Sequence, residues 1–165
     1  MYPHTGASIP PAAERVRQAL ASLGISAQIQ EFPQGTRTAQ DAARAIGTTL
    51  GQIVKSLVFV ADGRPVLVLA SGRNRVDSVK LARAAGAASV ERAGADLVRA
   101  ITGFAIGGVP PVGHATPLET FIDEDLLKYD IVYAAAGTPT AIFPIAPGDL
   151  IRATGGRMAD LAQPQ

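Results

Sequence analysis

The chain has 165 residues, 47% of them hydrophobic and 18% charged, with a formal net charge of +1. This length and apolar content are typical of one folded domain with a sizeable core, and they argue against a disordered chain. The near-neutral charge argues against a protein that binds DNA over a broad basic face. A nucleic-acid partner would be held by a local patch or by one of its ends.

Several kinds of site are excluded by residue type. Cysteine is absent, so the chain has no disulfide, no thiolate zinc site and no cysteine nucleophile. The two histidines, His4 and His114, cannot form a three-histidine metal centre, and we expect neither a metal nor a cofactor. No apolar stretch approaches the roughly 20 residues that span a bilayer, and the chain does not begin with a signal-peptide pattern, so we expect a soluble cytoplasmic protein without a membrane partner. The GxSxG, GxxxxGK(S/T) and strand-linked GxGxxG motifs are also missing, which disfavours a serine hydrolase, a P-loop protein and a Rossmann protein.

Apolar periodicity predicts the elements in the first half of the chain. A helix is expected over residues 10–24, because apolar residues recur at helical spacing until Gly24. Gly35 marks a break after the first expected strand. The expected elements in this half are the 10–24 helix, a strand over 25–32, a helix over 38–47, strands over 53–60 and 65–70 joined by a turn at 61–64, and a helix over 77–86.

The second half contains a long irregular segment. Residues 103–117 are dense in glycine and proline and cannot form regular structure. Around it we expect a helix over 95–101, strands over 120–122, 131–135 and 141–145, and a helix from Pro147 toward Thr154. Because several strands are joined by short hairpin-like links, the order predicts an α+β fold with a mixed sheet curled toward a barrel, rather than a doubly wound sheet. One domain, with its core over about residues 25–155, is expected.

Lys55 is the most informative residue, because it lies inside an apolar run from Ile53 to Val60. Strand side chains alternate between two faces, and both faces of this strand are otherwise hydrophobic. An isolated ammonium there is costly unless it is paired, hydrated or open to a pocket. Lys55 is therefore a candidate site residue, with Ser56 beside it on the opposite face. The structural alternative is a lysine that reaches the sheet edge or pairs with a carboxylate.

The segment from Gly107 to His114 is the second candidate, since it contains three glycines and two prolines. Glycine lets the backbone approach a ligand closely and leaves N–H groups free to face an oxyanion. Prolines hold such a loop in one shape, as preorganised donors require. A rigid surface connection is the alternative. His114 is either a general base or a contact to ribose or phosphate, or a solvated loop residue.

Two further positions and one loop are weaker candidates. Asp123 follows an expected strand, where an aspartate commonly caps the next helix but could also pair with Lys55 or orient a substrate amine. Gly137 ends a stretch of small residues against which a ligand could press. The loop Arg73–Arg75 is basic, and is either a phosphate contact or a solvated loop.

The segments that carry these residues occur in a familiar order. They are Gln52–Phe59, Val76–Ala82, Gly107–Pro111 with Gly113, Ile122–Asp123 and Ala135–Gly137. Together they resemble the YbaK-type aminoacyl-tRNA deacylases, which are freestanding relatives of the editing (insertion) domain of bacterial prolyl-tRNA synthetase. The resemblance covers roughly residues 25–155. It implies a mixed, barrel-like sheet ringed by helices and hydrolysis of the ester that joins a wrong amino acid to tRNA, most often a small residue on the tRNA for proline.

The resemblance also implies roles for individual residues. Lys55 matches the functional lysine of that family. Gly107 and Pro111 match the ends of its GxxxP loop, which binds the aminoacyl end and helps to place water. Asp123 and Gly137 match recurrent pocket positions. The predicted catalytic residues are Lys55, Gly107 and Gly108, and the predicted substrate-binding residues are Ser56, Val109, Pro110, Pro111, Gly113, His114, Asp123 and Gly137.

Ester chemistry agrees with a site that offers no obvious nucleophile. An aminoacyl ester is already activated, so a positioned water and a stabilised oxyanion can suffice, with each oxyanion donor worth about 3–4 kcal/mol. We predict that backbone amides of residues 107–111 and the Lys55 ammonium supply this stabilisation, although Lys55 could instead hold the terminal phosphate or adenosine. The predicted partner is mischarged tRNA, bound by its acceptor end. A second candidate partner is prolyl-tRNA synthetase, on which the protein could dock. The competing function is a non-catalytic module that binds aminoacyl-tRNA or a small ligand with the same fold.

Overall fold

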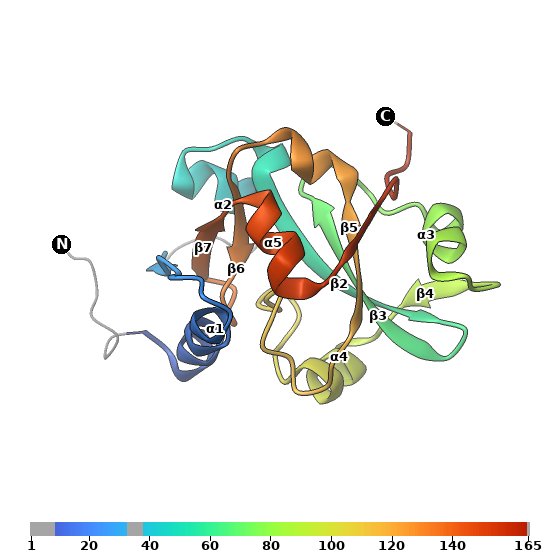
Figure 1. The fold of residues 1–165 in the computed structure, drawn as a ribbon, viewed down its shortest axis with the longest axis horizontal. Helices are drawn as coiled ribbons and strands as arrows, with labels where there is room; N and C mark the ends of the chain where they lie inside the picture. The colour runs from blue at the N-terminus through green and yellow to red at the C-terminus, as the bar shows by residue number, and fades with distance from the viewer. Residues whose placement is uncertain (1–8, 33–37, 165) are drawn as a thin grey trace.

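A mixed β-sheet forms the centre of the computed structural model, which describes residues 9–32 and 38–164. Eight strands join this sheet in the order β1-β7-β6-β2-β3-β5-β8, while β4 pairs with β2 outside that order. Antiparallel pairs such as β2 with β3 stand beside parallel pairs such as β3 with β5. Figure 1 shows helices on several sides of the strands. The expected α+β class with a mixed sheet is confirmed; the sheet ends at β1 and β8 and does not close into a barrel.

The helices and strands have the following bounds. The α-helices are α1 (Pro11–Ser22), α2 (Ala39–Ile46), α3 (Ser78–Ala85), α4 (Ala95–Thr102) and α5 (Pro147–Thr154), and two 3₁₀ helices are η2 (Leu50–Gln52) and η3 (Glu124–Lys128). The strands are β1 (Gln30–Glu31), β2 (Ile53–Ala61), β3 (Arg64–Ser71), β4 (Val90–Arg92), β5 (Glu119–Asp123), β6 (Val132–Ala135), β7 (Ala141–Ile145) and β8 (Arg157–Ala159). None of the helices in the described part of the chain is long and apolar enough to cross a membrane.

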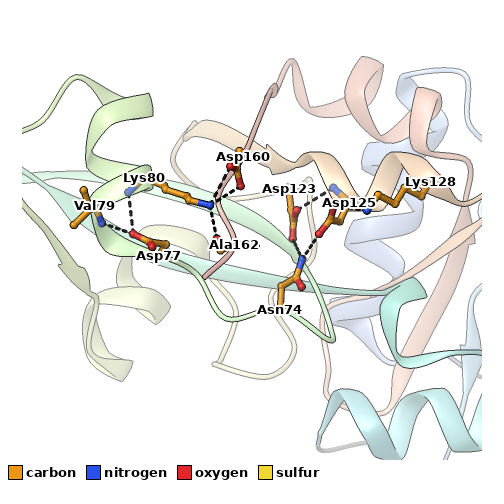
Figure 2. Close-up of polar contacts among 9 residues, drawn as sticks. All are labelled: Asn74, Asp77, Val79, Lys80, Asp123, Asp125, Lys128, Asp160 and Ala162. Carbon is orange, nitrogen blue, oxygen red and sulfur yellow. Dashed lines mark hydrogen bonds and ion pairs between the residues drawn. The ribbon is translucent and has the colours of Figure 1, made fainter. Parts of the chain in front are cut away.

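Local chemistry explains where α2 and α3 begin and end. The Thr38 hydroxyl accepts the Asp41 N–H at 3.0 Å at the start of α2, and Gly47 ends this helix with a φ of +83°. The Asp77 carboxylate accepts the N–H groups of the first turn of α3, as Figure 2 shows, and Gly86 ends that helix with a φ of +66°. Both helices match the expected ranges, because their caps satisfy backbone groups at the ends.

The β2–β3 hairpin fixes the register of the central strands. Its two turn residues, Asp62 and Gly63, have φ values of +48° and +85°, as a two-residue turn between twisted strands requires. The turn places Ala61 opposite Arg64, and the ladder continues past Lys55, which lies opposite Ala70, to the pair of Val54 and Ser71. β2 is covered on both faces, as its apolar run predicts. Val54 and Val58 belong to the core cluster that contains the buried residues of α1, whereas Phe59 packs with Leu81 of α3.

Two features of the strand prediction were wrong. Of the expected strand over residues 25–32, only Gln30–Glu31 pairs with another strand. Its partners are Ile142 and Ala141 of β7. The alternation of Ile25, Ala27 and Ile29 instead reflects side chains that pack against the core without backbone pairing. The short strands β4 and β8 were not expected, since each has only three residues that are mostly exposed and show no apolar pattern. The expected break at Gly35 lies outside the described residues.

Candidate functional site

One edge of β2 is divided between two short strands. β6 pairs with Ile53 and Val54, and β4 pairs with residues 59–61. Residues 55–58 lie between these pairings, and no described strand pairs with them on this edge, whereas β3 pairs with the opposite edge throughout. We call this gap the β2 notch. A cavity of about 300 Å³ is lined by all four notch residues and by residues of α2, β4, β6 and the glycine-rich loop.

Four of the predicted site residues meet at this cavity. Lys55 and Ser56 line it from the notch, and Gly107 and Val109 line it from the glycine-rich loop. The other predicted site residues are not among the residues that line the cavity: Gly108, Pro110, Pro111, Gly113, His114, Asp123 and Gly137.

Lys55 is half-buried, and no described carboxylate contacts its ammonium group. Its Nζ donates to the main-chain carbonyl of Asn74 at 2.5 Å, and no described carboxylate forms an ion pair with it. Burial first, and then the positive charge of Arg92, lower the pKa of Lys55 below its ordinary value of 10.5. The Asp123 carboxylate opposes this pKa shift, and Arg75 adds to it. Lys55 thus lines the cavity, and its ammonium is held by the Asn74 carbonyl with its charge only partly compensated.

A buried polar network holds the carbonyl that receives Lys55. The side-chain amide of Asn74 donates to Asp123 Oδ2 at 2.9 Å and to Asp125 Oδ2 at 2.8 Å, as Figure 2 shows. The same Asp123 oxygen accepts the Ser71 N–H at 3.0 Å. Asp123 Oδ1 accepts the Asp125 N–H, so Asp123 also caps η3. A cap of the following helix was one of the two roles considered for Asp123 from the sequence. Asp123 thus acts on Lys55 by fixing the Asn74 segment and by its charge, without touching the ammonium.

The network gives a stability prediction at Asn74, which is 3% exposed. Asn74→Ala removes one donor from each of two carboxylates, of which Asp123 is buried, and should lower the free energy of unfolding by about 1–3 kcal/mol. Urea unfolding measures this difference. Arg152→Ala is the control, because the exposed Arg152–Asp149 pair of α5 should contribute about 1 kcal/mol or less. Equal losses in the two variants would contradict the buried network.

The glycines of the site have different tasks. Gly107 is exposed at the cavity with a φ of +93°, and the nearest atom to a Cβ placed there is Pro139 Cγ at 3.7 Å. A Cβ at Gly108 would lie 2.7 Å from Thr138 Cα, and one at Gly137 would lie 2.7 Å from the Ala12 oxygen of α1. Gly108 and Gly137 therefore allow close backbone packing behind the cavity wall, and Gly107 is the glycine that faces the cavity.

His114 fixes the shape of the glycine-rich loop from outside the cavity. Its Nε2 lies 2.7 Å from the Pro110 carbonyl oxygen; since a carbonyl only accepts, Nε2 carries the proton. Burial lowers the pKa of the imidazole below its ordinary value of 6.5, and the bond to Pro110 opposes this shift. His114 is a partly buried loop residue that does not line the cavity.

We predict that His114 titrates below 6.5 in the folded protein. A lowered folded-state pKa means that the unfolded chain binds more protons in the interval below 6.5, so stability should fall as the pH drops through that interval and stay constant above it. An NMR titration of the ring protons measures the pKa, and a His4→Ala variant assigns the signals of the two histidines. A His114 pKa at or above 6.5 would contradict the buried, neutral imidazole.

Sequence reasoning missed several residues of the cavity. Arg92 lines it from the unexpected strand β4, and its guanidinium lies over the Phe59 ring at 5.6 Å from the centroid. Ile106, which is 49% exposed, and Pro139 line it from two loops. Tyr133 was inside a correctly expected strand, so the alternation of that strand could have placed it on one face. The sequence carries no local signal that brings Arg92 to this place.

Comparisons with known proteins show the family to which the chain belongs. Residues 33–153 match the model of the aminoacyl-tRNA editing domain family, and the chain belongs to that family. A crystal structure of a proposed trans-editing enzyme for prolyl-tRNA synthetase superposes with a TM-score of 0.91 at 49% identity, covering 95% of this chain and all of that one. The family resemblance read from the sequence is confirmed.

Two curated relatives show how the domain occurs elsewhere. EbsC of Enterococcus faecalis, a proposed Cys-tRNA(Pro)/Cys-tRNA(Cys) deacylase, is 30% identical over 125 residues, which are 75% of this chain and 76% of EbsC. The proline–tRNA ligase of Nitratidesulfovibrio vulgaris (strain DP4) is 36% identical over 102 residues, which are 61% of this chain but only 18% of the ligase. The same domain thus resembles a protein of similar length and a small part of a much longer synthetase.

Proposed function

We propose that this protein is a trans-editing hydrolase that releases a wrongly attached amino acid from tRNA. The carrying observation is a cavity, in a member of the aminoacyl-tRNA editing family, that is lined both by the half-buried Lys55 and by the exposed Gly107. Its volume of about 300 Å³ is at the lower end of ligand pockets, which suits an aminoacyl group better than a whole nucleotide.

The reaction needs water and charge stabilisation but no covalent intermediate. Water adds to the ester carbonyl carbon, and negative charge develops on the carbonyl oxygen as the tetrahedral intermediate forms. The Lys55 ammonium and loop amides near Gly107 stabilise that oxygen. The carbon–oxygen bond to the ribose then breaks, and the tRNA hydroxyl leaves with a proton that the attacking water supplied. An alternative task for Lys55 is to hold the terminal phosphate.

The proposed substrate is a small non-cognate amino acid on tRNA, with the tRNA for proline as first choice. The relation to EbsC and to a proline–tRNA ligase supports this choice. The enzyme would hold the acceptor end, consistent with a net charge of only +1, and could work docked on prolyl-tRNA synthetase. Charged tRNA as a substrate places this activity in the cytoplasm.

A panel of mischarged tRNAs tests the function directly. Release of at least one small amino acid by micromolar enzyme is expected. A matched preparation of an active deacylase provides the control for substrate quality. If no amino acid is released from any member of the panel, the competing function as a non-catalytic aminoacyl-tRNA or ligand-binding module gains support.

Lys55→Ala should lower the single-turnover rate of deacylation by about 100-fold or more, because an oxyanion donor of this kind is typically worth that much. The fold should survive, since the buried Asp123 carboxylate keeps its hydrogen bonds from Ser71, Asn74 and Asp125 when the ammonium is removed. Lys80→Ala is the matched control, because Lys80 bonds to Asp160 and does not line the cavity. Unchanged single-turnover rates in a folded Lys55→Ala protein would remove Lys55 from the site.

Alanine substitutions at two neighbouring glycines separate the cavity from its support. Gly107→Ala should slow hydrolysis by about tenfold or more, because it strains a backbone at φ +93° and places a methyl group beside the substrate. Gly108→Ala should mainly lower stability, by about 1–3 kcal/mol, because its Cβ would meet backbone atoms of Thr138. Rates and urea unfolding distinguish the two effects.

Gly148→Ala is the control for both glycine variants, since its Cβ would meet no atom within 4 Å and it lies in α5. Alanine is the better helix former, so this variant should be neutral or slightly more stable. A normal deacylation rate in Gly107→Ala would show that the loop is only a structural connection.

A further inference from the structure

The hydrogen bonds that flank the β2 notch determine where its backbone groups point. The Val58 carbonyl accepts the Ala93 N–H at 3.0 Å on the β4 side, whereas the Ile53 carbonyl accepts the Gly72 N–H at 2.7 Å on the β3 side. In an antiparallel ladder the N–H and C=O of one residue point to the same side, and this side alternates along the strand. Both main-chain groups of Ser56 therefore face the notch. Figure 1 shows β4 and β6 toward opposite ends of β2.

Ser56 presents three polar groups that have no protein partner in residues 9–32 and 38–164. No described backbone or side-chain group bonds to its N–H or C=O on the notch side. Its hydroxyl oxygen is buried and also lacks a hydrogen-bond partner among the described residues. Buried polar groups in folded proteins are nearly always satisfied. The N–H and C=O of a residue that lines the cavity thus indicate a ligand with complementary groups, whereas the buried hydroxyl lies out of its reach.

An α-aminoacyl group has the complementary groups at the required spacing. Its nitrogen and its carbonyl are separated by one α-carbon, as in one residue of a strand. In a hydrogen-bonded antiparallel pair, two facing residues exchange both of their N–H···O bonds. Peptide ligands use the same pairing when they add a strand to an open sheet edge. The notch has room for such a residue because β4 and β6 end before they meet.

We infer that the open edge of β2 binds the aminoacyl group as a one-residue strand. The substrate α-ammonium donates to the Ser56 carbonyl, and the ester carbonyl oxygen accepts the Ser56 N–H. This inference rests on the proposed function and assigns the main-chain contacts of its substrate. The Ser56 N–H also becomes an oxyanion donor, beside the Lys55 ammonium and the loop amides. Contacts to the main chain recognise any α-amino acid, so its side chain must be selected by the rest of the cavity wall.

Hydrogen exchange tests the geometry without any assay of activity. In the free protein, the Ser56 amide should exchange faster than the amides of Lys55 and Leu57, which face β3 in the same strand. The probes are the glycyl, alanyl, seryl and prolyl amides of 3′-amino-3′-deoxyadenosine, which cannot be hydrolysed as esters. At least one should slow Ser56 exchange by about tenfold or more. Slow Ser56 exchange in the free protein, or no effect of any probe on it, overturns the inference.

Two substitutions at one position isolate the main-chain donor. Ser56→Ala removes the hydroxyl, whereas Ser56→Pro removes the hydroxyl and the N–H. Proline is tolerated where the N–H faces away from the ladder, so Ser56→Pro should fold, and Leu57→Pro should not. Single-turnover deacylation should be about 100-fold slower in Ser56→Pro than in Ser56→Ala. Equal rates in the two variants overturn the inference; if Ser56→Pro does not fold, the exchange experiment decides.

The outcomes also separate this inference from the proposed function. Deacylation by the wild-type protein with no probe effect at Ser56 would keep the function and reject the main-chain contacts. Protection of Ser56 by a probe, with no release from any mischarged tRNA, would keep the contacts and reject the hydrolase.

Discussion

Unequal backbone pairing on the two edges of β2 is the constraint on which the site depends. The long ladder with β3 holds the strand rigidly in the centre of the sheet. On the other edge, β6 and β4 pair only with its ends, so the middle of a central strand stays accessible. Backbone hydrogen bonds elsewhere in the strand stabilise this arrangement. A strand paired fully on both edges would be equally rigid but would leave no space for a substrate.

The charge of Lys55 is tolerated because the surroundings satisfy its hydrogen bonding without neutralising it. A carboxylate in contact would form an ion pair and hold the ammonium away from a substrate. The Asn74 carbonyl oxygen instead accepts a hydrogen bond from the ammonium and leaves the positive charge in place. The carboxylates of Asp123 and Asp125 do not contact the ammonium but accept hydrogen bonds from the Asn74 side chain. The charge of Asp123 still opposes part of the lowering of the Lys55 pKa that burial causes.

A small cavity can exclude large amino acids but discriminates weakly among small ones. One methylene is worth only about 1–3 kcal/mol in an apolar pocket, which is why editing of small amino acids requires a separate site. The cavity here combines an apolar wall, including Val58 and Val109, with the main-chain groups of Ser56. Main-chain contacts fix the reacting ester, and the apolar wall limits the side chain. Substitutions in the apolar wall can therefore change which side chain fits without changing the main-chain contacts to the ester.

The sequence by itself determined the features that local chemistry encodes. Helix caps such as Asp77, the hairpin turn and the buried strand around Lys55 each follow from neighbouring residues, and the ordered motifs indicated the family. Only the tertiary structure decided which residues share the cavity. Arg92 reaches it from a strand too short to be recognised, and Asp123 lies behind the wall, because strand pairing depends on contacts between segments far apart in the chain. The open edge at Ser56 is likewise a property of how three strands meet, and no single segment encodes it.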